Sequence, residues 1–284
     1  MPVERNNAWV HSAVHPTISS NLKAAWTQRH LLLLLSLRAV LSLYRHATLG
    51  VGWIVIHALA QTVPAVFVVS HVLGIEEQGV PMPLVVLSGL TVWMIFRRSA
   101  HLMTRSLIQS RDILKRSYVP GLILLISRLA PSAVESFVGM CVLAIATVYY
   151  AISQDIHPFS IGWHNPATLV ALLIAAIFAL SIGCFTSVIN VIIRDTTLVL
   201  RYSLSIFMLS SPVFYPLGAV PEQWRIYLFI NPMSAAVEIF RFGLTGSTAA
   251  LTEYFVISAI VLIVISWLGL RFLSTYERVV IDIK

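Results

Sequence analysis

The chain has 284 residues, of which 58% are hydrophobic and only 11% are charged. Soluble domains carry roughly 25% charged residues, so this composition excludes a protein whose surface is mostly exposed to water. The formal net charge of +7 is explained better by the positive-inside rule and by anionic lipids than by nucleic-acid binding, and no nucleic-acid partner is expected.

The first 50 residues predict a cytoplasmic tail followed by an interfacial helix. This helix is expected to begin near Asn21, after a serine cap, and it combines Trp26 and several leucines with basic residues. Helices of this composition lie in the membrane interface. A transmembrane span over residues 31–43 is the alternative, but that stretch is short and contains Arg38.

Six transmembrane helices are predicted in the rest of the chain, because a spanning helix needs about 20 apolar residues. Their expected ranges are 51–73, 84–103, 122–150, 167–193, 198–215 and 254–273. Prolines and charges interrupt residues 216–246, which are expected to form a re-entrant or interfacial hairpin on the outer side. The sequence thus predicts an all-α integral membrane protein with one transmembrane domain over residues 1–284, comprising a six-span core over residues 51–273 and a cytoplasmic tail over residues 274–284.

Basic residues predict the orientation of these spans. Placing both termini in the cytoplasm puts all but three of the 19 Lys and Arg residues on the cytoplasmic side. Since Lys and Arg concentrate in cytoplasmic loops, this distribution favours a multi-pass protein with cytoplasmic N- and C-termini. The first 30 residues are mixed polar and do not resemble a signal peptide.

The sequence contains no motif for catalysis. A phosphate-binding P-loop ends in Gly-Lys followed by Ser or Thr, and none of the lysines follows a glycine. No catalytic grouping and no metal-binding pattern is found, so the chain is not expected to be an enzyme or to carry a cofactor. If the protein uses ATP, another chain must bind it.

Two pairs of charged residues interrupt the predicted spans. Arg128 and Glu135 share a face of the third span, about 10 Å apart along the helix axis. We expect both to face the protein interior, each with a partner on another helix or in a watery channel. Arg97 and Arg98 lie about 20 Å into the second span. They either capture an anionic substrate from the cytoplasmic side or extend toward lipid headgroups and only set the topology.

Short motifs follow one another in a specific order from about residue 36 to the C-terminus. In chain order they are residues 44–50 with Trp53, Gly89-Leu90 with Trp93, residues 113–120, Arg194-Asp195, Ser211-Pro212 with Tyr215, Asn231-Pro232 and Arg241. This order resembles the permease subunits of type-2 ABC exporters, a family that exports O-antigen, capsule and teichoic acid chains. Each motif also has a structural explanation as a turn, a helix break or a helix cap.

The resemblance implies a homodimer that assembles with two copies of a separate ATPase, which would bind ATP and Mg. The pore would lie between the two membrane subunits, and the substrate would be a lipid-linked glycan moved outward across the bacterial inner membrane. The basic loop over residues 106–118 would dock the ATPase, unless its charges only set the topology. The candidate coupling residues are Arg111, Asp112, Leu114, Lys115 and Arg116.

Aromatic side chains within the spans either anchor the helices at the membrane interface or offer flat surfaces to a glycan chain. With the intramembrane charges they form the candidate substrate path, which consists of Trp93, Phe96, Arg97, Arg98, Arg128, Glu135 and Tyr149. Two other functions remain open. One is an ABC permease for a small lipid or drug, and the other is a secondary transporter that uses Arg128 and Glu135 for ion coupling.

Overall fold

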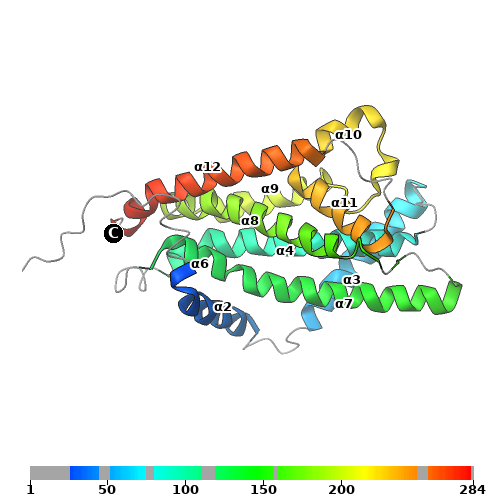
Figure 1. The fold of residues 1–284 in the computed structure, drawn as a ribbon, viewed down its shortest axis with the longest axis horizontal. Helices are drawn as coiled ribbons and strands as arrows, with labels where there is room; N and C mark the ends of the chain where they lie inside the picture. Colours follow the sequence, from blue (N-terminus) through cyan, green and yellow to red (C-terminus); the bar gives the residue numbers. More distant parts are fainter. Residues whose placement is uncertain are drawn as a thin grey trace, which may run out of the picture.

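The computed structural model describes residues 26–44, 52–74, 80–110, 119–155, 159–160, 162–247 and 255–282, and every regular element within these ranges is helical (Figure 1). The helices are α2 (Arg29–Tyr44), α3 (Gly52–Val66) with the π-helix η1 (Phe67–Val72), α4 (Met82–Gln109), α6 (Gly121–Ser127), α7 (Leu129–Gln154), α8 (Pro166–Ile192), α9 (Thr196–Leu209), the 3₁₀ turn η2 (Leu217–Ala219), α10 (Glu222–Leu228), α11 (Pro232–Thr245) and α12 (Phe255–Asp282). This confirms the predicted all-α fold class.

Each of the six predicted spans contains a helix or two consecutive helices of the bundle, but the fifth, predicted over residues 198–215, ends at Leu209, and residues 210–215 form the turn that follows α9. Four of these segments are long and apolar enough to cross a membrane, namely Gly52–Val72, Gly121–Gln154, Pro166–Ile192 and Phe255–Tyr276. Of the other two, α4 is 28 residues long but carries several arginines, and α9 is apolar but only 14 residues long. The chain is therefore an integral membrane protein, and the count of six crossings stays a prediction.

Helix α4 forms the centre of the bundle and packs against α7, α8 and α11, with α3 and α9 at its sides (Figure 1). Its aromatic residues Trp93 and Phe96 are both 1% exposed. The ring of Phe96 stacks on Phe178 of α8 with centroids 4.9 Å apart, and Phe207 of α9 lies against the same cluster. Three helices therefore share one aromatic core.

Hydroxyl groups add polar contacts between neighbouring helices of the bundle. Thr104 of α4 and Thr186 of α8 are hydrogen-bonded at 2.7 Å, as are Ser181 of α8 and Ser266 of α12. Small hydroxyl residues are typical of packed membrane helices, because they allow close approach and hydrogen-bond across the interface.

The third predicted span is broken into α6 and α7 at Arg128. Pro131 has no N–H, so the carbonyl of Ser127 lacks the hydrogen bond that residue 131 would donate in a regular helix. The helix therefore breaks about one turn before the proline. The N–H of Arg128 instead bonds the carbonyl of Leu125 at 3.0 Å, which tightens the chain locally. The predicted third span over residues 122–150, which the sequence showed to be interrupted by Arg128, Pro131 and Glu135, thus contains a helix break at Arg128.

The second predicted span is also longer than the sequence suggested, since α4 continues beyond residue 103 to Gln109. Met103 and Leu107 are buried there against the apolar residues of α6 and α8. This apolar packing extends the helix past the arginines.

Helices α10 and α11 follow α9 in the chain and precede α12. They lie at the end of the bundle where α4 and α8 begin (Figure 1). At the end of α11, the carbonyl of Gly243 accepts a hydrogen bond from the Asn165 amide beside the start of α8. The segment therefore stays at one end of the bundle, as expected for the predicted hairpin. Its re-entry from the outer side stays a prediction.

Helix α2 lies beside α6 at the opposite end of the bundle (Figure 1). One side of α2, with Leu31, Leu32 and Leu35, packs against the apolar cluster that contains the buried residues of α6. Leu37 and Leu41 are exposed. The predicted helix start near Asn21 lies outside the described residues. The position of α2 in the membrane interface stays a prediction.

Candidate functional site

The motif residues after α9 meet in one polar cluster at the end of the bundle that contains α11. Asn231 caps α11, since its side-chain oxygen accepts from the N–H of Met233 at 2.9 Å, and Pro232 occupies the first helical position. The same Asn231 amide donates to the hydroxyl of Ser211 at 2.7 Å. Pro212 is buried beside it in the turn that follows α9. These residues join the end of α9 to the start of α11.

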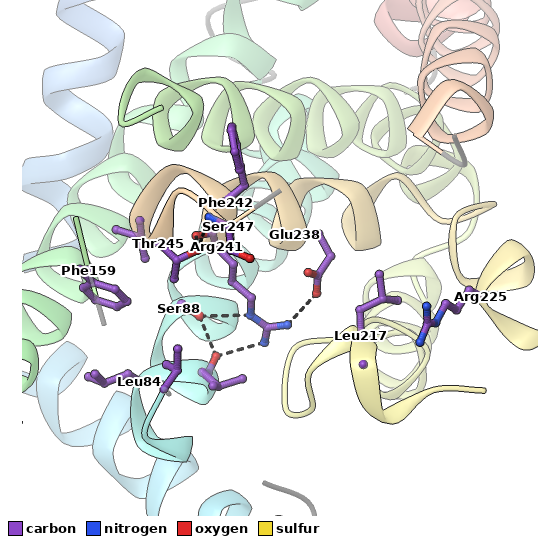
Figure 2. Close-up of a pocket in the computed structure, with 14 residues that line it drawn as sticks. Leu84, Ser88, Phe159, Leu217, Arg225, Glu238, Arg241, Phe242, Thr245 and Ser247 are labelled. Carbon is purple, nitrogen blue, oxygen red and sulfur yellow. Dashed lines mark hydrogen bonds and ion pairs between the residues drawn. The ribbon is translucent and has the colours of Figure 1, made fainter. Parts of the chain in front are cut away.

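Arg241 of α11 is the centre of a second part of this cluster (Figure 2). Its guanidinium forms an ion pair with Glu238 at 2.8 Å and donates to the hydroxyl of Ser88 at 3.3 Å. It also donates to the backbone carbonyls of Val85 and Tyr215, at 3.1 Å and 3.2 Å. These contacts tie α11 to α4 and to the turn after α9.

A cavity of about 340 Å³ adjoins this network, between α4, η2 and α11. Arg225 and Phe159 also line the cavity (Figure 2). Because the Arg241 guanidinium is already engaged by protein oxygens, we interpret Arg241 as a residue that positions helices. The cavity has mixed polar and apolar walls, and the half-exposed Arg225 lies among them.

Arg194 and Asp195 form an exposed turn between α8 and α9. The turn is held from inside by Asn190, which is 3% exposed. The Asn190 amide donates to the carbonyl of Thr104 at 3.0 Å, and its oxygen accepts from the hydroxyl of Thr197 at 3.0 Å. Asn190 was not predicted as a site residue, although a single Asn in an apolar run was the available signal.

A second cavity, of about 220 Å³, lies between α4 and α9 and has strongly basic walls. It is lined by Arg97, Arg98, His101, Arg201, Leu204 and Ser205. We call this the basic pocket. It contains the predicted arginine pair and four residues that were not predicted, of which two, His101 and Arg201, are basic.

Glu135 of α7 supplies a negative charge next to the basic pocket. Its carboxylate forms an ion pair with the Arg98 guanidinium, with Nε and Oε1 3.0 Å apart. The Arg98 side chain is 35% exposed and that of Glu135 is 16% exposed. Glu135 therefore finds its partner on another helix, as the spacing on α7 led us to expect.

The remaining predicted residues lie elsewhere. Arg128 lies at the break between α6 and α7, and its Nε is buried without a hydrogen-bond partner among the described residues. Trp93 and Phe96 belong to the aromatic core, whereas Tyr149 is 64% exposed near the end of α7. The predicted coupling residues Arg111, Asp112, Leu114, Lys115 and Arg116 lie outside the described residues.

The described residues contain no group of three or more His, Cys, Asp or Glu side chains that could hold a metal ion. The basic pocket instead presents three guanidinium groups and one imidazole. Guanidinium groups bind phosphate and carboxylate through paired hydrogen bonds. The arrangement is therefore suited to binding an anion.

Comparisons with known proteins point to one family. Residues 30–245 match the ABC-2 type transporter family. The O-antigen export system permease protein RfbA of Myxococcus xanthus is 23% identical over 215 residues, which cover 75% of this chain and 79% of that protein. The protein of the same name from Klebsiella pneumoniae is 20% identical over 198 residues, covering 70% of this chain and 73% of that protein. The chain therefore belongs to the ABC-2 type transporter family.

Proposed function

We propose that this chain is the permease subunit of an exporter that moves a lipid-linked polysaccharide outward across the bacterial inner membrane. The observation that carries the proposal is the similarity to two O-antigen export permeases over about three quarters of both chains. The substrate would be an O-antigen, a capsule chain or a similar glycan. Both termini would lie in the cytoplasm, in agreement with the distribution of Lys and Arg.

The assembly we propose contains two copies of this chain and two copies of an ATPase subunit. The chain has no P-loop sequence, so ATP and Mg would bind to the ATPase. The pore would form between the two permease subunits. The predicted ATPase-docking loop covers residues 106–118, but residues 106–109 belong to the last turn of α4; the basic residues that follow α4 would contact the ATPase and transmit its motion to this helix.

Family membership and geometry both argue against the secondary-transporter alternative. Glu135 pairs with Arg98 of α4. The Glu135 carboxylate is thus engaged by another helix, while Arg128 lies seven residues earlier at the α6–α7 break. A permease for a small lipid or drug would share the family and the fold, and only a transport experiment separates it from a polysaccharide exporter.

Gene deletion tests the proposed substrate. Deletion should remove the polysaccharide from the cell surface while its lipid-linked form accumulates in the cytoplasmic leaflet, and the wild-type gene should restore export. An inactivated P-loop in the proposed partner ATPase should give the same phenotype. Normal surface polysaccharide in the deletion strain would exclude the proposed function.

Charge reversal tests the contact with the ATPase. Changing Arg111, Lys115 and Arg116 together to Glu should reduce co-purification of the ATPase or uncouple its activity from export. Arg194→Glu is the control, because Arg194 is basic and exposed in another turn that is predicted to be cytoplasmic. If the triple variant and the control both bind the ATPase normally, the ATPase docks elsewhere.

A further inference from the structure

The basic pocket is unusual because its charges lie far from either end of a long buried helix. Arg97 lies 15 residues after the first residue of α4, which corresponds to about 22 Å along the helix axis. Arg98 and His101 follow on the same helix, and Arg201 and Ser205 face them from α9. Charged side chains at such depth are unfavourable in lipid, so they are expected to line a polar or water-filled path.

The charges around this pocket do not balance. Three arginines line it, and Glu135 is the acidic residue paired with one of them. Within the described part of the chain, the pocket therefore carries excess positive charge. An anion entering it would be attracted by guanidinium groups from two helices.

The walls of the pocket are only partly polar. Leu204 forms part of the lining, and the neighbouring α9 residues Tyr202 and Ile206 are about 70% exposed, at 69% and 72%. Apolar side chains therefore lie beside the basic groups. Such a combination suits a ligand that has a charged group at one end and a hydrocarbon chain beside it.

We propose that the basic pocket binds the phosphate or diphosphate group of the lipid-linked substrate. The inference rests on the proposed function and specifies where the charged group of the substrate is held. Arg97, Arg98 and Arg201 bind the phosphate oxygens through paired hydrogen bonds. His101 and Ser205 supply further hydrogen-bonding groups, and the hydrocarbon chain lies along the exposed apolar face of α9.

Glu135 has a defined place in this proposal as a positioning residue. Its ion pair with Arg98 holds the guanidinium at the pocket when no ligand is bound. A phosphate group then competes with the Glu135 carboxylate for the same guanidinium. Removing the negative charge of Glu135 should therefore strengthen phosphate binding, whereas removing an arginine should weaken it.

Direct binding to the purified full-length chain tests the proposal. The chain is placed in nanodiscs of neutral phosphatidylcholine, and binding of farnesyl diphosphate, a short prenyl diphosphate, is measured by calorimetry. Arg97→Gln, Arg98→Gln and Arg201→Gln are each expected to weaken binding by about tenfold or more, since each loses charged hydrogen bonds to the ligand. Glu135→Gln is expected to tighten it.

Arg105→Gln is the matched control for these variants. Arg105 is an exposed arginine of the same helix, and it does not line the pocket. This variant should bind farnesyl diphosphate like the wild type. Equal loss of binding in Arg105→Gln and Arg98→Gln would overturn the proposal, as would weaker binding by Glu135→Gln.

Three further ligands identify the source of the phosphate. Inorganic diphosphate and farnesol should each bind more weakly than farnesyl diphosphate, and nanodiscs that contain phosphatidylglycerol should compete little. Inorganic diphosphate binding as tightly as farnesyl diphosphate would assign the pocket to a free anion. Strong competition by phosphatidylglycerol would assign it to bulk lipid, and either result would overturn the assignment to a lipid-linked substrate.

The binding measurement does not depend on export. If the chain exports a glycan but does not bind the diphosphate, the pocket proposal fails while the proposed function stands. If the chain binds the diphosphate but its deletion leaves the surface polysaccharide intact, the proposed function fails instead. The two proposals can therefore be rejected separately.

Discussion

Replacing Arg241 with methionine removes the charge at the centre of the polar cluster shown in Figure 2. The Arg241 and Glu238 side chains are only 9% and 4% exposed, so the ion pair between them is almost fully buried. Removing one partner of a buried ion pair costs about 3–5 kcal/mol, because the other charge remains in a medium of low polarity. The backbone carbonyls of Val85 and Tyr215 also lose a donor. We therefore expect Arg241→Met to lower the stability of the protein by about 3 kcal/mol or more.

Thermal unfolding in detergent, followed by tryptophan fluorescence, measures this effect. On the scale known for domains of about 150–250 residues, such a loss lowers Tm by at least about 6 °C. Arg241→Lys should give an intermediate value, since lysine keeps the charge but lacks the planar group that reaches several acceptors.

Arg225→Met is the matched control. Arg225 lines the same cavity but is half-exposed, and its Nε donates to a single carbonyl, that of Val220, at 3.0 Å. Its loss should cost no more than about 1 kcal/mol. The reasoning is refuted if Arg241→Met melts within about 2 °C of the wild type, or if the two methionine variants are equally destabilised.

Other variants test the remaining parts of the fold. Asn231→Ala removes the cap of α11 and should lower the stability by about 1–2 kcal/mol in the same unfolding assay. Gly89→Ala would place a Cβ 2.8 Å from the Cα of Val213 and even closer to the Val213 carbonyl oxygen, in the turn after α9, and should cost about 1–3 kcal/mol. Gly218→Ala, whose Cβ would meet nothing within 4 Å, should leave Tm unchanged. Cysteine labelling tests the topology in a cysteine-free background, with inner-membrane vesicles that keep their native orientation. A membrane-impermeant thiol reagent added outside these vesicles should label Gln223→Cys and spare Asp195→Cys. The reverse pattern would contradict the predicted topology.

The fold class could be predicted from the sequence because the apolar runs are long and each coincides with a helix. Arg128 and Pro131 were recognised in the sequence as interruptions of the third span, but the exact position of the break, at Arg128, was not predicted. A proline shows that a helix can bend, but packing against neighbouring helices decides whether it bends or breaks. The end of α4 was also missed, because burial of Leu107 between other helices outweighs the nearby basic residues.

The basic pocket could be predicted only in part. Arg97 and Arg98 were recognisable as charges in an apolar segment, and His101 lies one helical turn after Arg97. Arg201 is about one hundred residues away in the sequence, and only the packing of α9 against α4 brings it to the same cavity. The ion pair between Glu135 and Arg98 also could not be predicted from the sequence. The position of Glu135 on one face of its helix does not show which other helix packs against that face.

The hydroxyl contacts between helices have a consequence for motion within the bundle. Thr104 can donate to the carbonyl of Ala100 in its own helix, 2.7 Å away, and Thr186 can donate to that of Ile182, 3.0 Å away. When two such hydroxyls separate, the one that bridged the helices turns back to its own backbone, so neither is left unsatisfied in the hydrocarbon. The hydroxyl contact between α4 and α8 can therefore break and form again at little cost in free energy. Buried ion pairs such as Arg241 with Glu238 resist the same separation, so the contacts at the α11 end of the bundle are costlier to break than the Thr104–Thr186 contact near the other end of α4.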